Sequence, residues 1–395
     1  MEVSQDDGAP SAARAASTPL VVRLAILTAF TPELRGWILA VPFNETLPFA
    51  EGLHPGQPPL QVNRALGVVG FSTGMGPYRT ASSLMAFGHD PRFDLRFATF
   101  LVAGIAGVDP AYGSIGSVFL PTHLIGLGQD YDLDGIGHVV SGRRNTDTSP
   151  PYPSAEVARE RNHLYVLEPA TVAWAFALAS SVQLPDVPSY QAARADYTEA
   201  PAQLPPRVVG GACASVSGET FWAGRESTQW ARNWTRYWSA GGATLAVSDE
   251  EDLALATALS ALTRAGRANA SRLVVMRSAS DYAYPPAGHE MATWFFGPTH
   301  MTGDSFGGLV LAGMPIVHAL TSTPLDATRS PPPPAPSGGG ECMEEASSAA
   351  LAWLLLTGAI GTVLVLLAML LAMRARSSPT IAVPRMRLAE ERASV

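Results

Sequence analysis

The amino-acid sequence predicts an α/β protein in which helices cover both faces of a central β-sheet. Hydrophobic residues make up 47% of the 395 residues, enough for a substantial core. Short apolar runs predict strands at 21–29, 66–72, 98–105, 115–120, 207–217, 272–278 and 307–317. Helical patterns lie between them, at 76–88, 168–181, 222–238 and 249–265. Strands that alternate with helices indicate a sheet with helices on both sides.

The composition changes along the chain and predicts five regions. Residues 1–20 are small and polar, which is typical of disorder. Residues 21–323 form the α/β domain, and 324–348 form a Pro-rich and then Gly-rich linker. The next segment, 349–373, carries no charge and is long enough for one transmembrane helix. A basic tail, 374–395, follows.

The orientation of the predicted membrane helix follows from the charges beside it. The tail contains five arginines, so the positive-inside rule places it in the cytoplasm and the domain outside or in a lumen. Sequons at Asn44, Asn233 and Asn269 agree with an outward-facing domain and predict a glycoprotein. No signal peptide is visible at the N-terminus, which favours the alternative of a tail-anchored protein with a cytosolic domain. We expect the outward-facing arrangement.

Charge and cysteine content exclude several classes of function. The formal net charge is -8, and no basic stretch lies outside the tail, so we expect no nucleic-acid partner. All 26 basic residues are arginine, which excludes Schiff-base chemistry and a P-loop lysine. The two cysteines, Cys213 and Cys342, have no metal-binding or redox spacing, and the histidines show no ligand spacing. No metal or cofactor is therefore predicted.

Two carboxylates stand where a strand is expected to end. Glu33 follows the first strand and lies beside Pro32, at a predicted helix N-terminus. It is either a glutamate favoured by the helix dipole or a functional acid. Asp281 follows the apolar run at 272–278. It either caps the next helix or is a positioned acid, because open α/β sheets bind ligands at the carboxyl ends of their strands.

Three further segments combine small or aromatic residues in ways that suit a ligand. The turn containing Thr73 and Gly74 lies between a strand and a helix and presents backbone N–H groups, although it lacks the third glycine of a dinucleotide fingerprint. Small residues at 103–107 allow a ligand to approach the backbone or let strands pack closely. Phe221 and Trp222 follow a polar turn and are suited either to stacking on a base or to the core.

Several stretches together resemble one family. These are STGMGPYRTASSLMAFGHDPRFDLRFATFLVAGIAGVDPAYGSIGSV (72–118), GQDYDLDGI (128–136), SDEEDLALATAL (248–259) and VVMRSASDYAYP (274–285). They are similar to the fungal purine nucleoside permease family, which is related to the nucleoside phosphorylase and nucleosidase superfamily. The resemblance covers about residues 21–320. It implies a three-layer sandwich with a central mixed β-sheet of the nucleoside phosphorylase type.

The resemblance also implies roles for individual residues. RSASD matches the superfamily pattern R-x-x-S-D, so Asp281 would protonate or hydrogen-bond N7 of a purine. AFTPEL resembles the loop that carries the water-activating glutamate of the nucleosidases, which places Glu33 in that role. SGETF resembles S-G-D-x-F and places Phe221 against the purine face. The full set of expected substrate-binding residues is Phe221, Trp222, Ser217, Thr73, Gly74, Gly104, Ala106, Gly107, Glu251 and Asp252.

Departures from the superfamily patterns leave the reaction open. Ile105 replaces a hydroxyl residue, and the ribose-binding M-E appears only as the acidic cluster 249–252. A phosphorylase would use phosphate as co-substrate, with Arg35 and Arg79 as its nearby cations. The sequence therefore predicts a single-pass membrane protein that binds purine nucleosides and takes part in their uptake, leaning towards a nucleosidase or phosphorylase. The alternative is a catalytically inactive nucleoside-binding component of a transport system. The resemblance also implies a homo-oligomer.

Overall fold

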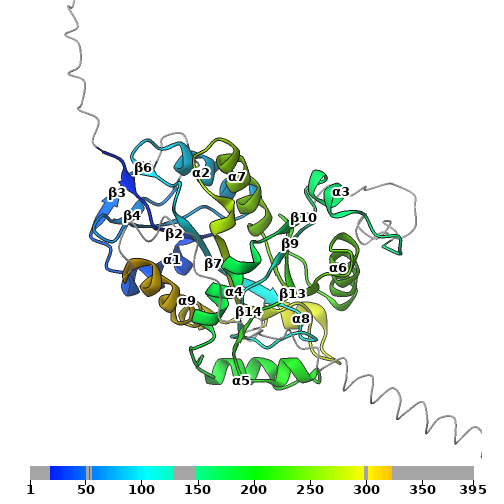
Figure 1. The fold of residues 1–395 in the computed structure, drawn as a ribbon. Coiled ribbons are helices and arrows are strands. Elements are labelled where there is room, and N and C mark those ends of the chain that lie inside the picture. Colours follow the sequence, from blue (N-terminus) through cyan, green and yellow to red (C-terminus); the bar gives the residue numbers. More distant parts are fainter. Residues whose placement is uncertain (1–17, 50–52, 54–55, 128–147, 298–300, 323–395) are drawn as a thin grey trace, which may run out of the picture. The chain divides into compact units, whose positions relative to one another are not determined.

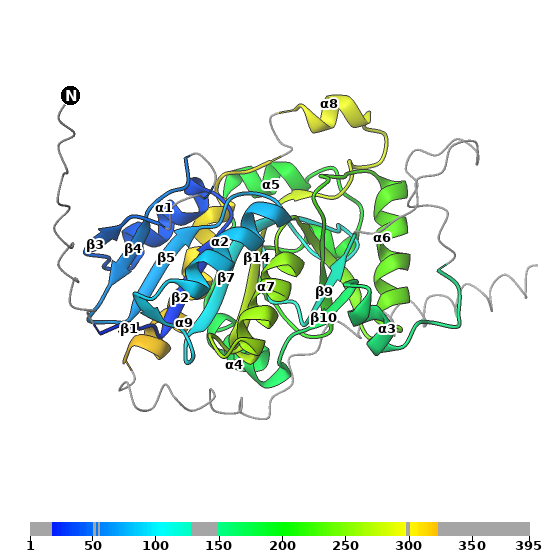
Figure 2. The same cartoon turned by 90° about the horizontal axis from the view of Figure 1, so that it is seen from above.

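The computed structural model in Figure 1 describes residues 18–49, 53, 56–127, 148–297 and 301–322. In this part of the chain, strands of one large sheet run in the order β10-β9-β12-β13-β7-β2-β5-β4-β3; β14 joins it beside β7, and β8 pairs with β14. The sheet contains both parallel and antiparallel pairs. Figure 2 shows α2 and α7 in front of the central strands and α9 behind them. The predicted α/β class with a central mixed sheet is thus confirmed.

The central part of the sheet is parallel and fully buried. Its strands are β2 (Leu24–Thr28), β5 (Val68–Ser72), β7 (Thr99–Val108) and β14 (Leu273–Tyr282). β7 pairs in parallel with β2 on one side and with β14 on the other. β2, β5 and β7 read as largely apolar runs because both of their faces are covered, whereas β14 becomes polar from Arg277 onwards.

A second group of strands meets the first at the end of β7. It comprises β9 (His123–Gly126), β10 (Leu164–Val166), β12 (Cys213–Ser217) and β13 (Thr244–Asp249). β13 pairs in parallel with β12 but antiparallel with β7, where Ser248 lies opposite Gly107. The carboxyl ends of β7 and β13 therefore overlap at the junction of the two groups.

Short strands complete the edges. β3 (Glu45–Leu47) and β4 (Leu60–Asn63) extend the sheet beyond β5 in antiparallel pairs. β8 (Val118–Phe119) links β14 to β11 (Val208–Val209). β1 (Leu20–Val21) and β6 (Phe93–Asp94) form a separate parallel pair.

The main helices are α1 (Thr31–Ala40), α2 (Pro77–His89), α4 (Pro169–Ala179), α6 (Arg225–Trp238), α7 (Asp252–Arg264) and α9 (Ser305–Ser322). Shorter ones are α3 (Ala155–Glu160), α5 (Pro188–Arg194), α8 (Met291–Phe295) and the 3₁₀ turns η2 (Ala200–Gln203) and η3 (Ala270–Arg272). Four of the main helices, α2, α4, α6 and α7, confirm the helical patterns of the sequence. The largest apolar core lies between the central strands and the helices α1, α2, α4, α7 and α9.

Three predicted elements were wrong. The single strand predicted at 207–217 is two strands, β11 and β12, which pair with different partners. Residues 307–317 belong to helix α9 and not to a strand, because a continuous apolar run has no periodicity that separates a buried helix from a buried strand. The strand at 272–278 continues to Tyr282, so Asp281 lies inside β14. It does not cap the following helix, α8, whose N-terminal cap is Glu290. In addition, β13 was not predicted.

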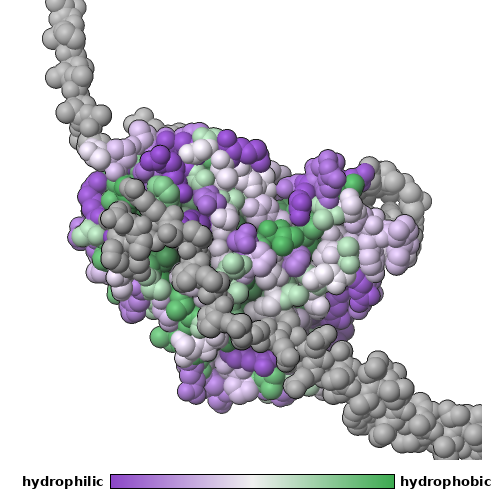
Figure 3. All heavy atoms as spheres, in the orientation of Figure 1, coloured by the Kyte–Doolittle hydropathy of each residue, from purple (hydrophilic) through white to green (hydrophobic). Residues whose placement is uncertain are grey.

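Helix α9 is the one helix in the described residues that is long and apolar enough to cross a membrane. It is partly buried in the domain, where it packs against α1, α4 and β14. The predicted transmembrane helix at 349–373, with the linker, the tail and the N-terminal 17 residues, lies outside the described residues. Figure 3 shows one face of the domain, on which apolar residues form small groups among hydrophilic ones.

Candidate active site at the end of the central strand

Glu33 is held at the end of β7 by two backbone donors. It lies in the first turn of α1 and is 1% exposed. Its Oε2 accepts a hydrogen bond from Ala29 N at 2.6 Å, and its Oε1 accepts one from Ile105 N at 2.8 Å. The carboxyl group is therefore fixed in position between Ala29 and Ile105 and is shielded from solvent.

Arg277 lies beside Glu33 and is almost completely buried. A Cβ atom built on Gly104 would lie 2.4 Å from Arg277 Nη1 and 3.1 Å from Glu33 Oε1, so both side chains meet over this glycine. Arg277 Nη1 also donates to the carbonyl oxygen of Ile105 at 3.0 Å. Gly104 is thus a position where only the absence of a side chain leaves room for the guanidinium.

The acidic cluster 249–252 surrounds the other side of the guanidinium. Arg277 Nη2 lies 3.2 Å from Asp249 Oδ1, 3.1 Å from Glu251 Oε2 and 2.6 Å from Asp252 Oδ1. Glu251 also accepts a hydrogen bond from Gly76 N at 3.1 Å, at the start of α2. The cluster therefore connects β13, β14 and the turn after β5 in one buried network.

Burial sets the proton affinity of Glu33. Loss of water raises its pKa to about 7, against the opposing effects of Arg277 and of the two backbone N–H groups. A group with this pKa accepts a proton readily at neutral pH. This is the property that a general base requires.

Asp281 belongs to β14 and lies opposite Gly107, which is further along β7 than Gly104. The pairing register of β14 shifts between Ala279 and Asp281, which is a β-bulge, and Asp281 pairs with Gly107. A Cβ atom on Gly107 would lie 3.1 Å from Asp281 Oδ2 and 3.0 Å from Ser248 Oγ. Gly104 and Gly107 are separated by about 10 Å of extended strand. The two acids are thus held at neighbouring but separate places.

Asp281 has simpler surroundings than Glu33. Ser280 Oγ donates to its Oδ1 at 2.7 Å, and the residue is 3% exposed. Burial raises the pKa of Asp281 to about 6, against the smaller effect of the serine hydroxyl. The acid therefore keeps a proton over part of the neutral range and can donate it to a leaving group.

The predicted aromatic residues lie in the loop between β12 and α6. Phe221 is 47% exposed, and its ring centroid lies 5.5 Å from that of Phe295 at the end of α8. Trp222 is half-buried and packs against the apolar cluster beneath α6. Of the two, Phe221 has the accessible ring that stacking on a base requires.

The hydroxyl residues of the predicted site have partners within the protein. Ser217 Oγ donates to Asp249 at 2.9 Å and accepts from Leu253 N at 3.2 Å. Thr73 Oγ1 donates to the carbonyl oxygen of Thr28 at 3.2 Å. Gly74, next to Thr73, has a φ of 92°, which a glycine adopts without strain. These residues hold together the strand ends that carry the acids.

The remaining predicted residues divide between the interior and the surface. Ala106 is buried, and its carbonyl oxygen accepts a hydrogen bond from Ser280 Oγ at 3.4 Å. Arg35 and Arg79, the expected phosphate ligands, are both exposed on α1 and α2. The structure thus brings Glu33, Gly104, Glu251 and Asp252 together around Arg277, and places these two arginines at the surface.

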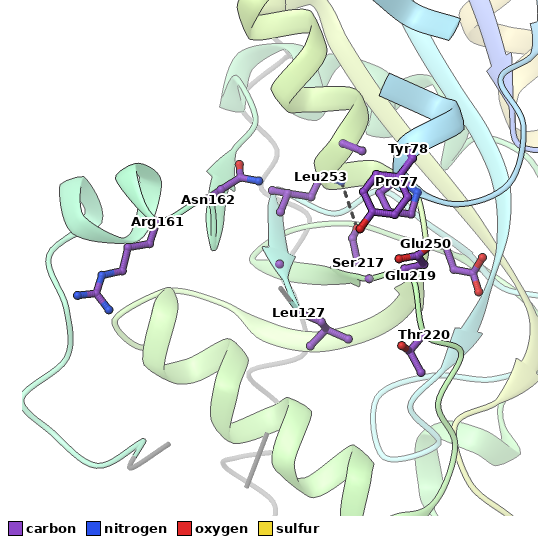
Figure 4. Close-up of a pocket in the computed structure, with 13 residues that line it drawn as sticks. Pro77, Tyr78, Leu127, Arg161, Asn162, Ser217, Glu219, Thr220, Glu250 and Leu253 are labelled. Atoms are coloured by element: carbon purple, nitrogen blue, oxygen red, sulfur yellow. Dashed lines mark hydrogen bonds between the residues drawn. The ribbon is translucent and has the colours of Figure 1, made fainter. Parts of the chain in front are cut away.

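A cavity of about 500 Å³ adjoins the acidic cluster. Figure 4 shows Ser217, Glu250 and Leu253 at its wall, with Tyr78 and Arg161 on opposite sides. Ser217 is the predicted substrate-binding residue that lines it; Glu33, Asp281 and Phe221 do not. The cavity shares a wall with the site but does not contain its two acids.

Arg277 was missed as a functional residue. A single arginine in the apolar run of β14 is a signal that could have identified it, because a buried guanidinium needs carboxylate partners. The sequence offers these partners in the cluster 249–252. Sequence reasoning treated this cluster as ribose ligands only.

The fold and the site together define an α/β protein with two buried acids at the end of its central strand. The chain belongs to the purine nucleoside permease family, whose model matches residues 21–324. A purine nucleoside permease of Candida albicans is 30% identical over 308 residues, covering 74% of this chain and 73% of the relative. A protein of Schizosaccharomyces pombe, named as a probable purine nucleoside permease, is 28% identical over 249 residues, covering 58% and 69%.

The chain is also similar to solved bacterial structures at low identity. A 5'-methylthioadenosine/S-adenosyl homocysteine nucleosidase of Campylobacter jejuni is 13% identical, with a TM-score of 0.46 and coverage of 76% of this chain and 100% of that one. The futalosine hydrolase of Helicobacter pylori is 13% identical, with a TM-score of 0.43 and coverage of 73% and 97%.

Proposed function

We propose that this protein binds purine nucleosides and hydrolyses their N-glycosidic bond. The observation that carries the proposal is the pair of buried acids, Glu33 and Asp281, whose pKa values are raised to about 7 and about 6 beside the glycines of β7. Membership of a nucleoside-related family supports the substrate class.

In the proposed reaction, Glu33 accepts a proton from water as the oxygen attacks the anomeric carbon. The bond between this carbon and the purine nitrogen breaks, and its electron pair goes to the base. Asp281 donates a proton to N7 and so neutralises the charge that develops there. The products are free purine and free ribose, and proton exchange with solvent restores both acids.

The charge around Glu33 favours water over phosphate as the acceptor. Arg277 is already in contact with Asp249, Glu251 and Asp252, so a phosphate dianion would meet several carboxylates at this place. The same negative surroundings stabilise the positive charge that develops on the sugar when the glycosidic bond breaks. The first effect favours hydrolysis over phosphorolysis, and the second assists cleavage of the glycosidic bond with either acceptor.

A role in uptake is the second proposed function, and the family name favours it. The family suggests membrane association, and the apolar segment 349–373 would anchor the domain. One helix does not line a nucleoside pathway by itself, because alternating access needs several spans. We therefore propose that the domain captures or cleaves nucleosides for a partner carrier or for an oligomer of this chain.

Product analysis of the full-length chain tests the proposal. Adenosine, inosine and guanosine are incubated with and without phosphate, and free base and sugar are separated by chromatography. We expect base and free ribose in both buffers. Sugar phosphate formed only with phosphate would replace hydrolysis by phosphorolysis, whereas nucleoside binding without any product would support the inactive binding component.

A further inference from the structure

Four carboxyl groups surround the guanidinium of Arg277. Asp249, Glu251 and Asp252 contact it directly, and Glu33 lies next to it over Gly104. All four are buried, with exposures from 0% to 9%. A buried site of this kind does not keep four negative charges against one positive charge, because desolvation favours protonation of the least supported group.

The hydrogen atoms of Arg277 are too few for the acceptors that converge on them. Nη2 carries two hydrogens, yet carboxylate oxygens of Asp249, Glu251 and Asp252 lie within 3.2 Å of this one nitrogen. At least one of the three contacts is therefore not a full hydrogen bond. A protonated carboxyl group is a weaker acceptor than a carboxylate, so a proton on one of the three reduces the competition for these hydrogens.

Asp249 is surrounded by the hydrogen-bond donors that stabilise an ionised carboxylate. It accepts hydrogen bonds from the hydroxyl groups of Ser215 and Ser217 and from the backbone N–H groups of Glu251 at 2.8 Å and Asp252 at 2.7 Å. Burial alone would raise the pKa of Asp249, but Arg277 and these donors hold it below its ordinary value. Asp249 is therefore the anion of the cluster.

Asp252 has far fewer hydrogen-bond donors around it. Its Oδ1 accepts from Arg277 Nε at 3.1 Å and from Nη2 at 2.6 Å. Its Oδ2 is buried and has no hydrogen-bond partner among the described atoms. An ionised oxygen in that environment is far less stable than a protonated one. Asp252 is also 0% exposed, which leaves it behind Arg277 and out of reach of a sugar hydroxyl.

We propose that Asp249 and Asp252 share one proton, which Asp252 carries at neutral pH, and that this neutral acid positions Arg277 beside Glu33. The charged groups that face Asp252 are Arg277 from β14, Asp249 from β13 and Glu251 from the preceding turn. Burial, together with the charge of the Asp249 carboxylate, raises the pKa of Asp252 to about 8, although Arg277 opposes the shift. The two carboxyl groups titrate as a pair.

A stability measurement tests the shared proton without any reference to catalysis. Because the pKa of Asp252 is higher in the folded state than in the unfolded state, its stabilising contribution is full below pH 4 and is lost as pH rises to about 8. Asp252→Asn keeps the acceptor for Arg277 and places an amide donor where the acid proton would be. The Tm of this variant of the full-length chain should rise relative to wild type by at least ~5 °C between pH 5 and pH 8.

Glu160→Gln, which changes an exposed carboxyl group on α3 outside the cluster, is the control. The difference in Tm between this control and wild type should stay constant from pH 5 to pH 8. A constant difference for Asp252→Asn as well would overturn the shared proton.

A kinetic measurement tests the positioning role, which rests on the proposed hydrolysis. If Asp252 is neutral, Asp252→Asn leaves the acid limb of kcat/KM in place and changes kcat less than tenfold, whereas Asp252→Ala lowers kcat at least tenfold. If Asp252 were ionised, the loss of its charge would lower the pKa of Glu33 and move the acid limb of Asp252→Asn to lower pH. Absence of hydrolysis in wild type would contradict the proposed function, and the stability measurement would still decide the protonation of Asp252.

Discussion

The two acids of the candidate site differ in their surroundings. Glu33 lies beside the guanidinium of Arg277 and the carboxyl groups around it, and burial raises its pKa against a nearby positive charge. Asp281 has the hydroxyl group of Ser280 as its side-chain partner, and burial raises its pKa with little opposition. Burial thus outweighs the nearby cation, because the pKa of Glu33, at about 7, lies above that of Asp281, at about 6.

The largest expected effect is on turnover. Glu33→Gln and Asp281→Asn remove the base and the acid, so each should lower kcat by about 10²–10⁴-fold. Nucleoside affinity should change much less, since each substitution keeps the shape of the side chain. Rapid-quench kinetics and equilibrium binding measure the two quantities, with exposed Glu160→Gln as the control. A loss of affinity as large as the loss of rate would assign both acids to binding.

The next largest effect is expected on the free energy of unfolding, and only for the buried network of Glu33 and Arg277. Arg277→Ala leaves several buried carboxyl groups without their cation and should lower the free energy of unfolding by about 3–5 kcal/mol. Arg64→Ala, which removes an exposed ion pair with Glu45, should lower it by less than about 1 kcal/mol. Urea denaturation compares the two variants, and equal losses would contradict the description of Arg277 as the centre of a buried network.

Gly104 and Gly107 in β7 allow a direct comparison of the surroundings of Glu33 with those of Asp281. Gly104→Ala places Cβ 2.4 Å from Arg277 Nη1, so the guanidinium must move, with an expected loss of about 1–3 kcal/mol. Gly107→Ala places it 3.0 Å from Ser248 Oγ and 3.1 Å from Asp281 Oδ2, which small side-chain shifts accommodate. Gly107→Ala should lie closer to wild type than Gly104→Ala, both in the free energy of unfolding and in kcat. The reverse order would contradict the crowding at Gly104.

The pH dependence of kcat/KM should report the titration of both Glu33 and Asp281. Glu33 must be ionised, so activity rises with pH as its proton is lost near pH 7, and Asp281 must be protonated, so activity falls as pH rises through about 6. The product of the ionised fraction of Glu33 and the protonated fraction of Asp281 is a bell with its maximum between pH 6 and pH 7, falling roughly twentyfold two pH units away on either side. A rate that reaches a plateau above pH 8 would exclude Asp281 as the proton donor.

The sequence predicted the α/β fold and several of the residues that meet at the site, because long apolar strands and helical periodicity are local signals. It did not distinguish helix α9 from a strand, since its apolar run around Pro315 lacks a clear period. It also did not show that the bulge in β14 extends the strand to Asp281, because a bulge depends on the partner strand. The role of Arg277 was missed for a similar reason, since its partners are more than twenty residues away.

The proposed roles of the two acids are tested most directly by changing the leaving group. A nitrophenyl riboside needs little protonation to depart, whereas a purine nucleoside needs it fully. We predict that Asp281→Asn regains most of the wild-type rate on the nitrophenyl riboside, and that Glu33→Gln stays impaired on both substrates because water still needs a base. Equal impairment of both variants on both substrates would contradict the assignment of Glu33 as base and Asp281 as acid.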